Sequence, residues 1–477
     1  MSPVPFMPPP GLNSDDTTFS AEGRWADGDG FRFWEGKAES IDGGSPLFTH
    51  PAASGSLDLF AFTRSGSTYI AYGQPGGLYV GSGLSSPSDR TPSPGPGTVA
   101  GWCFDSWGNT LLAAARDGKL YEQSGTSAAI EVVNAPDQIT AMLVSNERQV
   151  LAFGCNEEGS GTFNALCIRG SDIEDYTNWT TTATNNAFEH ILSGAGAIIA
   201  AARIGPHIAV WTTTALHLGQ FVGDPGQTYR FDMVAEQSGP MSARSVCVVN
   251  GIAYWMGFDH QLRSWTPGSL PASMACPISK EFRLYCEIAN QVNAAFLVQN
   301  AAHHELWFSY YDNRGQVRYI AVSLIDGAWF RGIRDMSACI DSELVRVLSG
   351  PSSTGVLISD SAGVIALREV LNSGLESDSA FIQSADQYLD EGQRRMMVRR
   401  LIPDFEEQSG SISLTLYMRD RPKSSTVTKG PYTIEGTDTK KDFRASGKLM
   451  AVKFSAQSAR RLRLGKPLFD MVPVGER

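Results

Sequence analysis

The sequence predicts an all-β protein with a β-propeller body, a C-terminal β-sandwich-like domain and an extended N-terminal arm. Three observations predict this class. The 477 residues include 48 glycines and 25 prolines, and only 19% are charged. Short apolar runs separated by turn residues recur through the middle of the chain, which is typical of many short strands. Long helices are disfavoured, and residues 279–295 are the best helical candidate.

Residues 1–45 are expected to be an arm followed by short strands. Five of the first ten residues are proline, which favours an extended chain. Residues 23–41 then place aromatic and basic side chains around the turn Asp27-Gly28-Asp29-Gly30. So many large rings this early in the chain must be buried against a later segment or another subunit.

Residues 46–375 contain seven units in which an apolar strand, a polar turn and a second strand follow one another. The central strands of these units begin near residues 69, 111, 150, 207, 252, 306 and 356. Repeats of ~40 to 50 residues with several strands each are what propeller blades require. Another β arrangement stays open as the alternative, as does the number of blades, and no Trp-Asp dipeptide recurs that would indicate WD repeats.

Residues 376–477 are expected to form a separate β domain. Residues 411–418 alternate apolar and polar side chains as a half-buried strand does, and residues 430–434 and 450–454 add further strands. From residue 391 onward 18 Lys/Arg stand against 10 Asp/Glu, whereas the preceding residues carry 21 and 40. An acidic body argues against DNA binding by the body, because phosphate contacts need Lys and Arg.

The densest basic runs lie in this C-terminal region and are the predicted interface. Their arginines are Arg394, Arg395, Arg399, Arg400, Arg460, Arg461 and Arg463. Such runs can pair with an acidic partner surface or bind phosphate. Solvated strand faces are the alternative interpretation of the same residues.

No catalytic, cofactor-binding or metal site is predicted. In His303-His304-Glu305 the neighbouring side chains of a strand point to opposite faces, so the two imidazoles cannot easily share a metal ion. A solvated strand start is expected there instead. Asp172, Glu174 and Asp175 lie in a Ser/Thr/Asn-rich stretch typical of a solvated loop. Walker, nucleophile-elbow and dinucleotide-binding glycine motifs are absent. We therefore expect a protein that is not an enzyme and holds no cofactor.

Two further residue types support a structural rather than a chemical role. The seven cysteines are scattered without a C-x-x-C pair, which favours small core residues in a reducing compartment. The indoles of the body lie inside apolar strands, which favours core packing over stacking on sugars. These residues are Trp211, Trp255, Trp265, Trp307 and Trp329. No apolar run approaches the ~18 residues of a membrane helix.

Both ends of the chain resemble a known family. Residues 23–41 resemble the opening run of bacteriophage tail proteins, and residues 399–405, 444–453 and 462–467 resemble their C-terminal part. With the propeller-like body, these motifs resemble the tail hub or nozzle proteins of short-tailed bacteriophages. The resemblance covers residues 11–45 and about 395–477, and the middle matches only in architecture.

The resemblance implies a structural virion protein that is made in the bacterial host cytoplasm and resides in the tail. In that family a homo-oligomeric ring, usually of six subunits, lies below the portal and adaptor and forms the DNA exit channel. Implied partners are the adaptor and portal proteins, tail fibres or spikes and passing double-stranded DNA, with no membrane. The family offers no catalytic residues. The alternative is a propeller-based receptor- or carbohydrate-binding tail protein.

Overall fold

The computed structural model describes residues 3–52, 58–97, 99–291, 294–371, 373–376, 380–389, 392–456 and 461–474. It is built almost entirely of strands, as predicted. Two short α-helices, α1 (Ser279–Tyr285) and α2 (Glu343–Ser349), occur in the described residues, together with the 3-10 turn η1 (Ile288–Asn290). The predicted helix at 279–295 is shorter than expected, because Cys286 adopts an extended conformation and ends it. Among the described residues no helix has the length and apolar character to span a bilayer.

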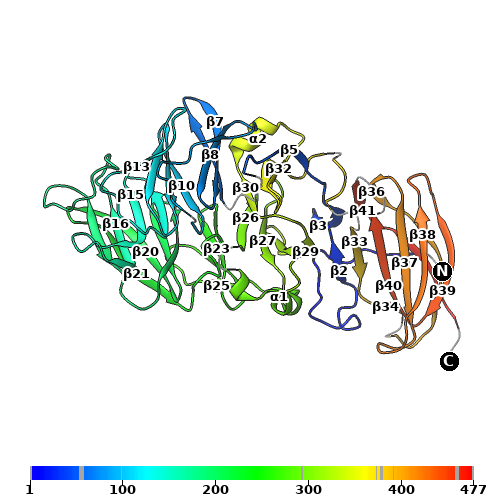
Figure 1. Cartoon of the computed structure of the whole chain (residues 1–477). Helices are drawn as coiled ribbons and strands as arrows, with labels where there is room; N and C mark the ends of the chain where they lie inside the picture. The colour runs from blue at the N-terminus through cyan, green and yellow to red at the C-terminus, as the bar shows by residue number, and fades with distance from the viewer. Residues whose placement is uncertain are drawn as a thin grey trace.

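Within the described residues the body is a β-propeller of seven four-stranded antiparallel sheets (Figure 1). In Figure 1 the blades follow one another around a ring, from β7 at the top through β15 and β21 to β23 and β30. The central strand of each blade falls where the sequence predicted it. The second domain lies at the right of the same view, beside blades 6 and 7.

Blades 1 to 4 follow one another along the chain. Blade 1 consists of β6 (Asp58–Arg64), β7 (Ser67–Gln74), β8 (Gly77–Ser82) and β9 (Ser88–Asp89). Blade 2 consists of β10 (Trp102–Trp107), β11 (Thr110–Ala115), β12 (Leu120–Gln123) and β13 (Ile130–Glu131). Blade 3 consists of β14 (Ala141–Val144), β15 (Val150–Asn156), β16 (Phe163–Gly170) and β17 (Phe188–Ile191). Blade 4 consists of β18 (Ile198–Ile204), β19 (His207–Thr212), β20 (Ala215–Asp224) and β21 (Gln227–Glu236).

Blades 5 to 7 complete the ring. Blade 5 consists of β22 (Val246–Val249), β23 (Ile252–Met256), β24 (Leu262–Trp265) and β25 (Ala272–Ser273). Blade 6 consists of β26 (Phe296–Asn300), β27 (Glu305–Tyr311), β28 (Val317–Ser323) and β29 (Trp329–Ile333). Blade 7 consists of β30 (Ala338–Asp341), β31 (Val356–Ser359), β32 (Val364–Leu367) and β5 (Ser45–Thr49).

An early strand closes the ring. The innermost strand of each blade contacts that of the next, and β30 of blade 7 contacts β6 of blade 1. The outermost strand of blade 7 is β5, which pairs with β32 in the register Val364↔Thr49. Hydrogen bonds between the two ends of the propeller segment therefore hold the last blade together.

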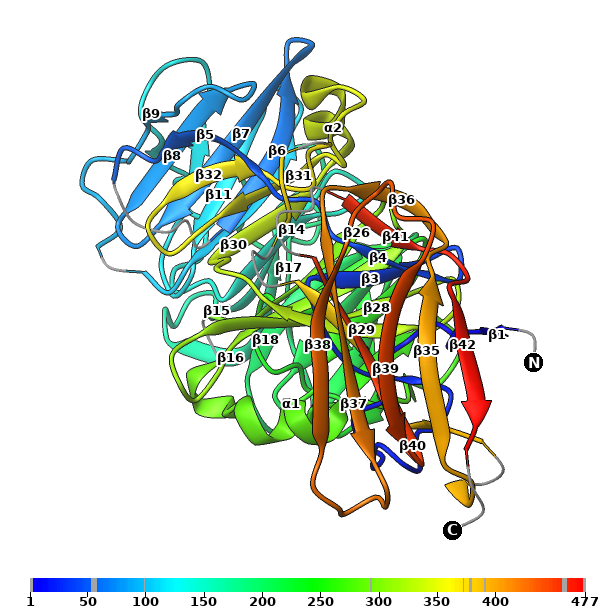
Figure 2. The same ribbon diagram turned by 90° about the vertical axis from the view of Figure 1, so that its right-hand side faces the viewer.

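The second domain draws its strands from both ends of the chain. The sheet farthest from the propeller contains β1 (Val4–Pro5), β42 (Leu468–Pro473), β35 (Met396–Ile402) and β39 (Lys441–Gly447). It packs on a sheet of β2 (Trp25–Asp29), β33 (Phe381–Ser384), β40 (Leu449–Ala456), β37 (Ile412–Arg419) and β38 (Val427–Ile434), with β34 (Gln387–Tyr388) on β40. A third sheet contains β3 (Phe31–Trp34), β4 (Lys37–Ser40), β41 (Arg461–Leu464) and β36 (Phe405–Ser409). Figure 2 shows this domain in front of the propeller.

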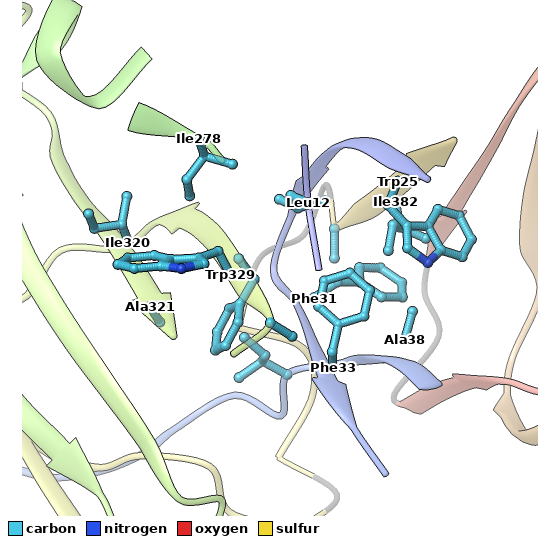
Figure 3. Packing of buried hydrophobic residues seen from close by; sticks show 14 of the residues in the cluster. Leu12, Trp25, Phe31, Phe33, Ala38, Ile278, Ile320, Ala321, Trp329 and Ile382 are labelled. Carbon is cyan, nitrogen blue, oxygen red and sulfur yellow. The ribbon is translucent and has the colours of Figure 1, made fainter. Parts of the chain in front are cut away.

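The aromatic side chains of the N-terminal region are buried against later segments, as predicted. Trp25, Phe31 and Phe33 are at most 3% exposed. Figure 3 shows Phe31 and Phe33 between Trp329 of blade 6 and the pair of Trp25 and Ile382 in the second domain. Even the proline-rich start is anchored, because the Phe6 ring lies edge-on against the Trp25 ring at 5.6 Å between centroids.

Five tryptophans inside apolar strands of the body are core residues, which confirms the interpretation of their sequence context. They are Trp211, Trp255, Trp265, Trp307 and Trp329, each no more than 3% exposed. Buried indoles in adjacent blades also contact one another, as Trp211 and Trp255 do at 5.7 Å between ring centroids. Their faces are therefore occupied by protein and cannot stack on a sugar.

Candidate protein interface

A buried ion network lies where the second domain meets blades 6 and 7. Arg32 of β3 forms an ion pair with Glu305, at 3.0 Å between Nε and Oε1, and donates from Nη1 and Nη2 to Glu369 at 2.7 and 2.8 Å. All three side chains are at most 3% exposed. Next to them, Arg368 lies 3.6 Å from the centre of the Trp307 ring and donates to Glu376 at 2.6 Å.

Burial and charge act in opposite directions on the two carboxylates of this network. Burial raises the pKa of Glu305 to about 8, although the positive charge of Arg32 opposes that rise. Burial also acts to raise the pKa of Glu369, but Arg32 and a hydrogen bond to His303 outweigh it and hold that pKa well below its usual range. The prediction of a solvated strand start at His303-His304-Glu305 is therefore wrong for Glu305, which is fully buried.

A cleft of about 210 Å³ opens beside this network, between α1, blade 6 and the second domain. Its cations are already paired within the chain. Arg331 bonds Glu281 and donates to Asp27 at 2.8 Å, and Arg318 donates to Asp312 at 2.6 Å. No group of three or more potential metal ligands was found in the described residues. Both arginines of the cleft are thus paired with carboxylates of the chain itself.

The acidic stretch at residues 172–175 is a surface loop, as predicted. Glu174 pairs with Arg148 at 2.8 Å, and the side chain of Glu174 is 62% exposed. Hydrogen bonds from Thr177 lower the pKa of Asp175. Carboxylates that are solvated and readily ionised in this way lack the environment of a general acid.

The structure separates the predicted interface arginines into different surroundings. Arg461 pairs with Glu407 at 2.6 Å, and Arg463 pairs with Glu35 at 2.5 Å and Glu406 at 3.1 Å. These pairs run across β4, β41 and β36 and tie the two ends of the chain together. Arg460 lies outside the described residues.

Arg399 and Arg400 share the outer face of the sheet farthest from the propeller. A β-bulge between Val398 and Arg400 breaks the alternation of β35, so two consecutive side chains leave the same face. Arg400 donates to Asp442 at 2.5 Å, and Arg399 is exposed.

Arg394 and Arg395 belong to a larger group of cations at one end of the second domain. We call this group the basic end, which consists of Arg394, Arg395, Arg421, Lys423 and Lys448. The first two precede β35, the next two lie in the β37–β38 turn, and Lys448 lies in the β39–β40 turn. Asp420 contacts the group and pairs with Arg395 at 3.2 Å.

Two residues of the basic end, Arg421 and Lys448, line a surface hollow of about 430 Å³ together with Phe19, Gln393, Asp420 and Leu449. Arg421, Lys423 and Lys448 have no carboxylate partner among the described residues. Sequence reasoning missed these three because each is an isolated cation in a turn. Strand pairing brings these turns together. Of the basic end, only Arg394 and Arg395 form a basic run that was recognised in the sequence.

No protein-family model and no curated protein matches the chain. Solved structures that are similar include the WD40 domain of Toxoplasma gondii coronin, at 10% identity over 72% of this chain and 87% of that one, with a TM-score of 0.40. BBS1N in complex with ARL6DN is similar at 10% identity over 71% and 100%, with a TM-score of 0.42. PorZ of Porphyromonas gingivalis is similar at 8% identity over 70% and 44%, with a TM-score of 0.39. The β-propeller assignment here rests on the strand pairing itself.

Proposed function

We propose that this chain is a structural component of a bacteriophage tail. Several copies would form the hub or nozzle ring below the portal and adaptor, which closes and guides the DNA exit channel during genome ejection. In this role the protein acts without catalysis or cofactor. It is made in the host cytoplasm and resides in the virion tail.

One observation carries this proposal: the two segments that resemble tail hub proteins form a single structural unit. β3 and β4 from residues 23–41 share one sheet with β41 from the C-terminal motif, and Glu39 of β4 pairs with Arg463 of β41. Leu462 N donates to Ser40 Oγ at 2.9 Å, which joins the two segments directly. Two resemblances at opposite ends of the sequence thus correspond to one domain, which favours shared ancestry over coincidence.

The charge distribution supports the same role. DNA must slide through an exit channel without adhering to it, and acidic walls repel phosphates where Lys and Arg would bind them. The propeller, residues 45–371, carries 18 Lys/Arg and 28 Asp/Glu. Such a body suits a conduit better than a DNA-binding surface.

The alternative, a receptor- or carbohydrate-binding tail protein, lacks a comparable observation. Sugar binding by a propeller relies on exposed rings. Five tryptophans of the body strands are buried, and the half-buried Trp107 has the Arg148 guanidinium 4.8 Å from its ring centre. No second function is proposed.

The test is the location of the protein in phage particles. Particles from a host that carries the gene should contain this chain by mass spectrometry, and specific antibodies should label one tail end in negative stain. An amber mutant grown without suppressor should give DNA-filled heads with incomplete tails. Purified infectious particles that lack every peptide of this chain would overturn the proposal. Labelling of the head protein serves as the positive control.

A further inference from the structure

Carboxylates gather on one face of blades 2 and 3. We call this group the acidic surface, which consists of Asp117, Glu131, Asp137, Glu157, Glu158 and Glu189. Asp117 lies in the β11–β12 turn, Glu157 and Glu158 in the β15–β16 turn, and Asp137 in the connection between the two blades. The Asn156 N–H donates to the Asp137 carbonyl at 3.1 Å, so the connection and the β15–β16 turn lie together. The cation that pairs within this group is Lys119, which bonds Glu131 at 2.6 Å.

The acidic surface and the basic end lie at opposite ends of the molecule. Blades 2 and 3 stand across the ring from blade 6, whose strand β29 contacts β2 and β3 of the second domain. In Figure 1, β13 and β15 lie toward the left, while β38 and β39 lie at the far right. Carboxylates therefore gather on the side of the propeller away from the second domain, and the second domain carries the local group of cations at its basic end.

We infer that the basic end of one copy docks on the acidic surface of a second copy. This head-to-tail contact rests on the proposed ring of like subunits and specifies which surfaces meet in it. Because the two surfaces differ, each bound copy leaves one of them free, and the contact repeats until rotation closes a ring. The second copy is favoured as the partner because the chain itself supplies the complementary charge, whereas its acidic body repels DNA.

The contact has the properties of exposed charge pairs. Arg421 and Lys423 are exposed, as are Glu131 and Asp137, so each pair gains little energy in water and is screened by salt. Opposite patches of this kind speed encounter and fix orientation more than they add affinity. Self-association should therefore be reversible and stronger at low ionic strength.

The experiment is sedimentation velocity of the full chain at ~20 mM and ~0.3 M salt, where the Debye length falls from roughly 20 to 6 Å. The wild type should associate at low salt and dissociate at high salt. A basic-end variant (Arg421→Glu, Lys423→Glu, Lys448→Glu) and an acidic-surface variant (Glu131→Lys, Asp137→Lys) should each weaken self-association at least tenfold. Mixed together, the two variants should associate again, because their altered surfaces are complementary.

A matched control reverses two exposed carboxylates elsewhere in the body. Asp224→Lys and Glu236→Lys on β20 and β21 change the net charge as the acidic-surface variant does, but they should leave association unchanged. Circular dichroism confirms that each variant is folded. A wild type that stays monomeric at low salt, a mixture that fails to associate, or a basic end that retains DNA at ~0.15 M salt overturns the inference.

The two proposals fail separately. If the chain is found in tails but the charge-reversed variants still build normal tails, the head-to-tail contact is wrong and the virion role stands. If particles lack the chain while the paired variants restore association, the contact stands and the virion role is wrong.

Discussion

Arg32 illustrates how one side chain joins the propeller to the second domain. Its guanidinium forms ion pairs with Glu305 and Glu369, and all three side chains are buried. Replacing Arg32 with methionine keeps much of the volume but removes the ion-pair partner of Glu305 and the main cation of Glu369, which then has only the more distant guanidinium of Arg368 at 3.7 Å. We expect the free energy of unfolding to fall by roughly 3 to 5 kcal/mol, as for other broken buried ion pairs. Urea denaturation at neutral pH measures the loss.

Two further variants test this explanation. Arg32→Lys should recover only part of the stability, because one ammonium cannot reproduce the planar donors that contact both carboxylates. Arg399→Met removes an exposed arginine from the outer sheet and should change stability by about 0.5 kcal/mol or less. A loss under about 1 kcal/mol for Arg32→Met would contradict the role given to the network.

At the residue scale the sequence predicted burial better than it predicted partners. Three of the four rings of residues 23–41 and the five tryptophans inside apolar strands of the body are buried as expected, because large aromatic side chains in apolar runs are favoured in the core. The ion network could not be predicted, since Glu369 lies 337 residues from Arg32. Glu305 in particular was expected in solvent, because two histidines beside a carboxylate resemble a polar strand end until their partners are known.

At the scale of elements, the pairing of β5 with blade 7 depends on His50, the residue that follows β5. His50 N–H donates to the Gly363 carbonyl at 2.8 Å, which extends the pairing of β5 with β32. The His50 ring lies 4.6 Å from the Tyr79 ring of blade 1. Its Nδ1 accepts hydrogen bonds from Ala52 N at 3.2 Å and Gln74 Nε2 at 3.0 Å, so a proton on Nδ1 would break both.

This arrangement predicts that acid weakens the closing strand. Burial lowers the pKa of His50 to about 4, below its value of about 6.5 in an unfolded chain. The unfolded state then binds more protons between these values, so stability falls as the pH drops from about 6.5 to about 4. We expect His50→Gln to remove roughly 3 kcal/mol or less of this pH dependence, measured as the difference between unfolding curves at pH 7 and pH 4.5. Identical pH dependence in both proteins would contradict the assignment.

The elements themselves followed from the sequence where their signal was local. All seven central strands of the blades were located, because each is an apolar run bounded by turn residues. The pairing of β5 with the last blade was not predicted, since its partner comes from the other end of the propeller segment. The predicted length of the helix at 279–295 was too great. α1 buries only Phe282, and the residues after α1 form part of the connection between two blades.

At the scale of the whole molecule, the two ends of the chain form one domain that cannot be divided by truncation. Removing residues 391–477 would take away β35 to β42 and leave β4 without its partner β41. The sequence could predict a basic C-terminal region, but not that N-terminal strands complete it. Tests of the charge asymmetry therefore require point substitutions in the folded chain.

The overall charge distribution predicts weak binding to duplex DNA. At ~0.15 M salt we expect a dissociation constant for duplex DNA no tighter than about 10 µM. The acidic body repels phosphates, and the basic end supplies only a few cations. Fluorescence anisotropy with a labelled duplex measures it across a salt series. The variant Arg421→Glu, Lys423→Glu, Lys448→Glu should abolish the residual binding at low salt, whereas Glu131→Lys with Asp137→Lys should strengthen it. Submicromolar binding by the wild type at ~0.15 M salt would contradict the role of an exit channel, because a channel wall that binds DNA tightly would hinder release of the genome.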